Sequence, residues 1–290
     1  MIYSLNILIK IFYKEIFKRS IQMDLKSICK DIREDTVRCI ASIEVGHIGG
    51  CLSIVEILAT LYFREMNIDP QNPNMDGRDR LIVSKGHAGP SVYATLANRG
   101  YFDKELLLTL NKGGTSLPSH CDMNRTVGID MTTGSLGQGF SCAVGIALGS
   151  KIKKDGAYIY TIIGDGESQE GQIWEAAMFA GGKKLNNLIA FTDLNGMQID
   201  GMVGDINGIE PISDKWKSFG WNVYEIDGHD LDQIAHAIKN AKAQQNRPTM
   251  IIAKTIKGKG ISFVEAKGFG SHNMPFKAED AEKAIEEIRR

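Results

Sequence analysis

The chain is organised around residues 157–201, which read AYIYTIIGDGESQEGQIWEAAMFAGGKKLNNLIAFTDLNGMQIDG. Residues 159–163 form a short apolar run rich in β-branched side chains, and it stops at Gly164-Asp165-Gly166 as a buried parallel strand stops at a turn. Residues 170–181 have the small-residue face of a packed helix, and residues 188–192 form a second apolar run. This pattern predicts a βαβ unit.

Asp165 follows the first predicted strand and Asn195 follows the second. Because the crossover makes the strands parallel, both side chains fall at one carboxyl edge, where open α/β folds bind ligands. A carboxylate, an amide oxygen and the backbone carbonyl of Met197 would form an oxygen-only half-shell that suits Mg²⁺, with Ca²⁺ or Mn²⁺ as substitutes. Because only one of these ligands is charged, the bound metal would keep a net positive charge, so we expect an anionic ligand such as a diphosphate. Gly164 and Gly166 would let this ligand approach the backbone closely.

The segments GDGESQEGQ and DLNGMQIDG resemble the thiamine diphosphate motif as transketolases carry it, and the resemblance extends over residues 24–274. Five or six predicted strands alternate with helices, so the expected fold is α/β, a doubly wound and mainly parallel sheet with helices on both faces. The resemblance implies the diphosphate-binding half of a transketolase. It also implies transfer of a two-carbon ketol unit from a ketose phosphate to an aldose, as in the pentose phosphate pathway.

Two histidines match family segments that contact the reacting sugar. His47 lies in residues 45–50, Val45-Gly46-His47-Ile48-Gly49-Gly50, which are predicted to form a glycine-rich loop between helices, and His120 stands in Ser119-His120-Cys121-Asp122. The resemblance assigns both side chains to hydroxyl groups of the sugar phosphate substrates. The sequence departs from the family at Ile48, where proline is usual, and around His120, where Gly-His-Pro-Glu is usual.

Two further histidines match segments at the cofactor's phosphates. His87, in Ser84-Lys85-Gly86-His87, follows a predicted strand and precedes a helix, where it could donate to an anion. His272, in Gly270-Ser271-His272-Asn273, resembles the histidine that closes over the diphosphate and the substrate. The resemblance therefore makes His87 a cofactor ligand and gives His272 both a cofactor-binding and a catalytic role.

The segment Thr132-Thr133-Gly134-Ser135-Leu136-Gly137-Gln138-Gly139 resembles family loops that lie against the pyrimidine end of the cofactor. Gly134 and Leu136 are therefore candidate cofactor contacts. Glu170 resembles the family position that communicates with a glutamate arriving from a partner domain, so it is a candidate catalytic residue. A partner surface is expected to dock near Glu170.

Composition limits the class of protein. With 290 residues, 43% of them hydrophobic and 24% charged, the chain can bury the core of one large α/β domain. A net charge of −1 provides no basic field for nucleic acid, and no segment has the length and composition of a membrane span. Five scattered cysteines suit a reducing compartment, so we expect a cytoplasmic protein.

We expect three parts along the chain: an extension over residues 1–22, the cofactor-binding domain over residues 23–276, and a polar helix over residues 277–290. The extension is either an amphipathic surface helix or an over-extended start ahead of Met23. Outside the candidate site, His229 is expected to cap a helix or to face solvent. Lys257 and Lys259 have the pattern of solvated lysines.

The resemblance also implies a partner. In this family the glutamate that activates the cofactor comes from a pyrimidine-binding domain, and the sequence stops at Arg290 before any such domain. We expect the partner to be a C-terminal transketolase subunit in a heterotetramer, while this chain alone could form a homodimer. The alternatives are a deoxyxylulose phosphate synthase-like enzyme and a non-catalytic cofactor-binding module.

Overall fold

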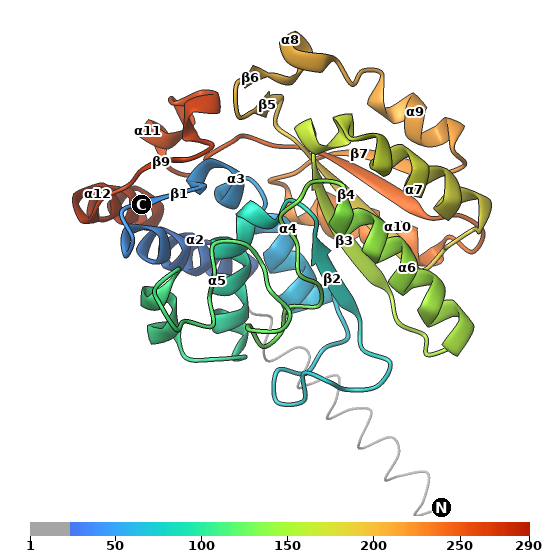
Figure 1. Ribbon diagram of the computed structural model, residues 1–290, viewed down its shortest axis with the longest axis horizontal. Helices are drawn as coiled ribbons and strands as arrows, with labels where there is room; N and C mark the ends of the chain where they lie inside the picture. The colour runs from blue at the N-terminus through green and yellow to red at the C-terminus, as the bar shows by residue number, and fades with distance from the viewer. Residues whose placement is uncertain (1–23) are drawn as a thin grey trace, which may run out of the picture.

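The computed structural model describes residues 24–290. The extension expected over residues 1–22 lies outside the described residues. The helices and the main strands alternate along the chain (Figure 1). The helices are α2 (Leu25–Ala41), α3 (Ile48–Leu52), α4 (Val55–Thr60), α5 (Gly89–Arg99), α6 (Gln138–Lys153), α7 (Gly171–Gly182), α8 (Val203–Asn207), α9 (Ile212–Ser218), α10 (Leu231–Ala243), α11 (Ser262–Glu265) and α12 (Ala278–Arg289).

The central sheet has five parallel strands, which confirms the predicted α/β fold. In spatial order they are β2 (Arg80–Val83), β3 (Ile159–Gly164), β4 (Leu188–Leu194), β8 (Thr249–Lys254) and β7 (Asn222–Asp227). Two short antiparallel pairs lie outside it. They join β1 (Val45–Gly46) to β9 (Met274–Pro275) and β5 (Met197–Gln198) to β6 (Gly201–Met202).

Alternate residues of the strands pack into two separate cores, one on each face of the sheet. In β3, Ile159 and Ile163 belong to the core beneath α6, α7 and α9, whereas Tyr160 and Ile162 belong to the core beneath α2, α4, α5 and α10. In Figure 1, α6 and α7 lie on the right of the sheet and α2 and α5 on the left. The period of two along each strand therefore builds the doubly wound arrangement.

The β-strands end at one edge in a register that brings functional groups together. Gly164 at the end of β3 pairs with Asp193 in β4, and Leu194 pairs with Lys254 at the end of β8. Asp227 at the end of β7 also pairs with Lys254. The residues that follow these strands thus meet at the carboxyl edge of the sheet.

The glycine-rich break expected around residues 45–50 is shorter than predicted, because α3 already begins at Ile48. Glycine is required in this helix for close packing. A Cβ on Gly49 would lie 2.3 Å from Ser271 Oγ, and one on Gly50 would lie 3.1 Å from His87 Nε2. The helix therefore lies directly against the segments that carry His272 and His87.

Candidate active site

A cavity of about 330 Å³ opens at the carboxyl edge of the sheet. It is lined by every residue that the sequence singled out as a candidate for the cofactor, the metal or catalysis. These residues are His47, His87, His120, Gly134, Leu136, Gly164, Asp165, Gly166, Glu170, Asn195, Met197 and His272.

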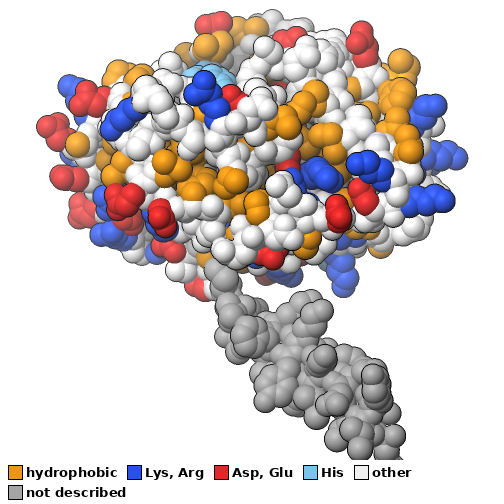
Figure 2. Space-filling view, turned by 60° about the horizontal axis from the view of Figure 1, so that its bottom comes forward, with side chains coloured by type: hydrophobic (Ala, Val, Ile, Leu, Met, Phe, Trp, Pro, Cys, Tyr) orange, Lys and Arg blue, Asp and Glu red, His pale blue; other side chains and the backbone are white. Residues whose placement is uncertain are grey.

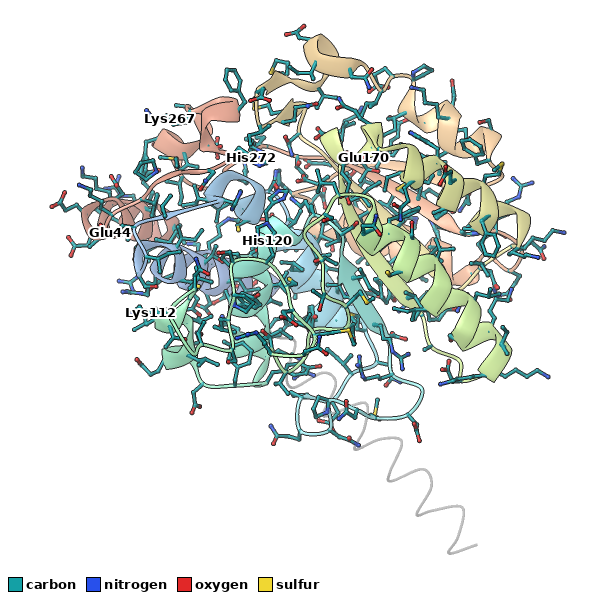
Figure 3. The ribbon with its side chains drawn as sticks, in the orientation of Figure 1. Glu44, Lys112, His120, Glu170, Lys267 and His272 are labelled. Atoms are coloured by element: carbon teal, nitrogen blue, oxygen red, sulfur yellow. The ribbon has the colours of Figure 1, made fainter. Side chains whose placement is uncertain are left out.

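Four histidines from separate segments form one wall of the cavity. The ring centroids of His47 and His87 are 5.3 Å apart, those of His87 and His272 are 4.9 Å apart, and those of His47 and His120 are 5.7 Å apart. Pairing of β1 with β9 aligns Gly46 with Met274, which brings His47 beside His272. Figure 3 shows His120 and His272 coming from different segments, with Glu170 on another element across the site.

All four histidines are held in their neutral form at pH 7. Burial, then the neighbouring His120 and Lys257, lower the pKa of His47 to about 4, and burial with Lys257 lowers that of His272 to about 4. Burial and the charge of Lys85 hold the pKa of His87 well below its usual value, and burial lowers the pKa of His120. Each imidazole can therefore donate one hydrogen bond and accept another.

A buried ion pair forms the floor of the cavity. Lys85 Nζ lies 2.6 Å from Asp193 Oδ2 and donates to the Gly50 carbonyl at 2.7 Å. Asp193 also accepts hydrogen bonds from Ser53, Asn195 and Thr255. Burial alone would raise the pKa of Asp193, but Lys85, Thr255 and Ser53 bring it below its usual value.

Asp165 is a buried carboxylate without a cation. Its oxygens accept hydrogen bonds from the backbone of Gly166 at 2.8 Å and of Gly196 at 2.5 Å. No lysine, arginine or histidine of residues 24–290 lies within ion-pair distance of it. Burial and the charge of Asp193 raise the pKa of Asp165 to about 6. A cation bound at this carboxylate would stabilise its charged form and so lower its pKa.

Lys257 is a buried positively charged residue that also has no ion-pair partner in the described chain. Lys257 is only 4% exposed, and its Nζ lies 3.5 Å from His272 Nδ1. No carboxylate of the described chain forms an ion pair with it. Burial and the charge of Lys85 lower the pKa of Lys257. The expectation that Lys257 is solvated is wrong, because the loop after β8 turns its side chain into the cavity.

The geometry fits a metal–diphosphate pair. A metal ion would neutralise Asp165 and a diphosphate would neutralise Lys257, with oxygen ligands from Asp165, Asn195 and the main chain. In residues 24–290, no group of three or more histidine, cysteine, aspartate or glutamate side chains could hold a metal by itself. Oxygens of the diphosphate, or water in its absence, would therefore complete the coordination shell.

Glu167 is a residue that sequence reasoning missed. Its buried carboxylate accepts from Ser84 Oγ at 2.5 Å, from Gly137 N at 2.9 Å and from Gly164 N at 3.0 Å. It therefore ties together three of the loops that surround the cavity. Burial raises its pKa, while these hydrogen bonds act in the opposite direction.

His229 also departs from expectation. The cap of α10 is Asp230, which accepts from the amides of Asp232 and Gln233, and the His229 side chain is 12% exposed. Its ring instead bonds to Glu56 and to the backbone of Ile256. The prediction that His229 caps a helix or faces solvent is therefore wrong.

Comparison with known proteins identifies the family. The sequence profile of the family described as "Transketolase, thiamine diphosphate binding domain" matches residues 25–288. The 6-deoxy-6-sulfo-D-fructose transketolase subunit SqwG of Clostridium sp. (strain MSTE9) is 59% identical over 93% of this chain and 98% of its own length. An apulose-4-phosphate transketolase subunit of Phocaeicola vulgatus is 37% identical over 88% of this chain and 90% of its own.

Solved structures agree. Transketolase from Campylobacter jejuni superposes with a TM-score of 0.85 at 33% identity, covering 91% of this chain and 42% of that one. A transketolase from Pichia stipitis in complex with sedoheptulose 7-phosphate also gives 0.85, at 32% identity over 91% of this chain and 40% of that one. The chain therefore belongs to the transketolase family, whose members transfer ketol units with thiamine diphosphate, and it spans about two fifths of these full-length structures.

Proposed function

We propose that this protein is the thiamine diphosphate-binding subunit of a two-chain transketolase that transfers a two-carbon ketol unit from a ketose to an aldose. The observation that carries the proposal is the cavity with an unpaired buried carboxylate, Asp165, and an unpaired buried cation, Lys257. A magnesium ion with the cofactor's diphosphate would satisfy both. The identity to relatives described as transketolase subunits supports the same assignment.

In this proposal Asp165, Asn195 and the backbone of Met197 hold the metal, with Ca²⁺ or Mn²⁺ as substitutes. Lys257, His87 and His272 donate hydrogen bonds to the phosphates, while Gly164 and Gly166 allow their close approach. Gly134 and Leu136 contact the rest of the cofactor. Thiamine diphosphate, when bound, supplies the carbanion and the electron sink for ketol transfer.

Three of the histidines in the cavity wall would then interact with the sugar substrate. His47 and His120 are neutral and lie on the same side of the cavity, so each could exchange one hydrogen bond with a substrate hydroxyl. His272 lies beside His47 and Lys257, where it could pass a proton between the substrate and the phosphate side. The protein thus orients the sugar and places neutral acid–base groups at its hydroxyls.

We also propose a partner chain with the pyrimidine-binding domain, in an assembly with two copies of each. Hydrophobic side chains remain exposed at the cavity rim, where Leu136 is 38% and Ile199 58% exposed. Others lie on the α6–α7 side, where Ile152 is 72% and Met178 59% exposed. Figure 2 shows hydrophobic side chains in groups across one face and at its right-hand edge. Exposed Glu170 at the rim would face the partner.

The donor we propose is 6-deoxy-6-sulfo-D-fructose, the sugar in the name of the 59% identical relative. A phosphorylated ketose of the pentose phosphate pathway is the second candidate, because a Pichia stipitis neighbour holds sedoheptulose 7-phosphate. Both of the compared relatives are transketolases, which favours ketol transfer over a deoxyxylulose phosphate synthase-like reaction.

The donor is tested with the chain co-expressed with a candidate partner chain that carries the pyrimidine-binding domain. Rates of aldose consumption are measured with the sulfonated ketose, with fructose 6-phosphate and with sedoheptulose 7-phosphate. We expect the highest kcat/KM for the sulfonated sugar. A preference for a phosphorylated donor would overturn the donor assignment, and cofactor binding without turnover on any donor would favour a non-catalytic module.

No helix in the described part of the chain has both the length and the hydrophobicity to cross a membrane. The four buried cysteines and Cys142 are all free thiols. Because free thiols persist in reducing compartments, they support the proposal that this protein functions in the cytoplasm.

A further inference from the structure

We infer that Arg33, Glu56 and His229 form a positioning cluster, called here the outer clamp, which holds the loop of residues 255–260 so that Lys257 faces the cavity. The inference rests on the proposed function, in which Lys257 meets the diphosphate. None of the three clamp residues lines the cavity, so they act through the loop.

The clamp is a continuous chain of buried charged groups. Arg33 donates to Glu56 Oε1 at 2.5 Å, and Glu56 Oε2 lies 2.9 Å from His229 Nδ1. The three side chains are 9%, 10% and 12% exposed. They come from α2, α4 and the segment that follows β7, so they join three distant parts of the sequence.

The hydrogen bonds to the loop fix the state of the histidine. Ile256 N–H donates to His229 Nε2 at 2.9 Å, so this nitrogen must accept and Nδ1 must carry the proton that it donates to Glu56. Arg33 Nε donates to the Lys259 carbonyl at 3.0 Å. The clamp therefore holds the loop at two backbone atoms, one on each side of Lys257.

The inner side of the same loop is also anchored. Thr255 donates to Asp193, and Gly258 N–H donates to the Gly49 carbonyl at 3.0 Å. Gly258 and Gly260 have φ values of +84° and +94°, which glycine adopts without strain. The backbone on both sides of Lys257 is thus fixed from the cavity side and from the clamp side.

A clamp is needed because Lys257 is unfavourably placed before a ligand binds. Its ammonium group is buried beside the second cation Lys85, and burial and that charge lower the pKa of Lys257. A loop free to rotate would turn the ammonium toward water. Buried ion pairs add little net stability in general, so a positioning role explains this cluster better than a stabilising one.

The test is a double-mutant cycle on the full chain, with thiamine diphosphate and Mg²⁺ as the probe in calorimetric titrations. We expect His229→Ala to weaken binding about tenfold, as removal of groups behind a ligand does. In the Lys257→Ala background, the same change should weaken binding less than about twofold, because its effect passes through Lys257. His229→Gln should restore part of the affinity, since its carbonyl can accept from Ile256 N–H.

The matched control is His236→Ala, which removes an exposed histidine of α10 and should leave the affinity unchanged. Hydrogen exchange of residues 255–260 in the ligand-free chain provides a second measurement, and we expect faster exchange only in the His229→Ala and Glu56→Gln variants. Equal binding by His229→Ala and wild type, or equal losses in both backgrounds, would overturn the clamp. A wild-type chain that binds no thiamine diphosphate would instead overturn the proposed function.

Discussion

Two lysines and two aspartates at the site are buried charged residues, and one pair of them forms an ion pair. Lys85 and Asp193 neutralise each other, whereas Asp165 and Lys257 form no ion pair within the described chain. The four histidines beside them carry no charge at pH 7. In the proposed function, electrostatic recognition of a metal–diphosphate would therefore depend on Asp165 and Lys257, and the histidines would contribute hydrogen bonds.

The first prediction concerns Asp165. A proton competes with the metal for a carboxylate of pKa about 6, so lowering the pH from 7 to 5 should weaken Mn²⁺ binding about tenfold. Free Mn²⁺ is followed by its electron paramagnetic resonance signal in the absence of thiamine diphosphate, so that no cofactor phosphate titrates in the same pH range. Asp165→Ala should abolish binding, and Asn195→Ala should weaken it but keep the pH dependence. Equal affinity at both pH values would contradict the assignment.

The second prediction separates the histidines by kinetic signature. His47→Ala and His120→Ala should lower turnover of the proposed two-chain enzyme about 100-fold with cofactor affinity nearly unchanged, because in the proposed function these side chains contact only the sugar. His87→Ala and His272→Ala should raise the dissociation constant for thiamine diphosphate, because each removes a donor to its phosphates. Unchanged cofactor affinity in both of the latter variants would refute this division.

Among the residues of the site, those that belong to sequence motifs could be predicted, whereas those whose contacts are distant in the sequence could not. His47, Asp165 and Asn195 were found because motif text or a strand end identifies them. The Lys85–Asp193 pair joins residues 108 positions apart, which no local pattern shows. Lys257 lies shortly after the end of β8, and Asp165 lies directly after the end of β3. The position of Lys257 after a strand therefore pointed to the site, but lysines are usually exposed, and this favoured the wrong expectation that it is solvated.

Among the elements, α3 shows how tightly the site is packed. The third prediction is that Gly49→Ala destabilises the protein by about 1–3 kcal/mol, because the new Cβ would lie 2.3 Å from Ser271 Oγ. Since Ser271 precedes His272, cofactor affinity should fall as well. The matched control is Gly145→Ala in α6, where no atom lies within 4 Å of the new Cβ.

The control should stabilise the protein by about 0.5–1 kcal/mol, the usual gain of alanine over glycine within a helix. Urea unfolding of both variants provides the measurement. Equal stability of Gly49→Ala and the wild type would show that the 268–271 segment does not press on α3.

Strands β3 and β4 could be predicted to within one and two residues, because each is a short apolar run that ends in a turn. The spatial order of the strands in the sheet could not be predicted. β8 lies between β4 and β7, so two consecutive strands enter the sheet in reverse order, which depends on tertiary packing. The helix at Ile48–Leu52 was missed because its glycines, required for close packing, have the sequence pattern of a loop.

For the molecule as a whole, the fourth prediction is that removing residues 1–22 leaves the melting temperature and the cofactor affinity unchanged. The family match begins at residue 25, and α2 begins at Leu25 with Asp24 accepting from Lys26 N–H at 3.0 Å. Thermal unfolding of the shortened and full chains is compared. A fall of several degrees would mean that the removed residues pack on the domain.

In the proposed function, the cavity is one half of an active site and a partner chain completes it. Exposed hydrophobic residues at the rim, such as Ile199, and exposed Glu170 are the surfaces that the partner would cover. A partner that excludes water from the cofactor would be required for ketol transfer.

The most direct test measures ketol transfer from a ketose to an aldose by the purified chain, with thiamine diphosphate and Mg²⁺, in the absence and presence of the proposed partner chain. We predict that the chain alone binds the cofactor but gives no substantial turnover, and that adding the partner restores it. Substantial turnover by the isolated chain would contradict the half-site account.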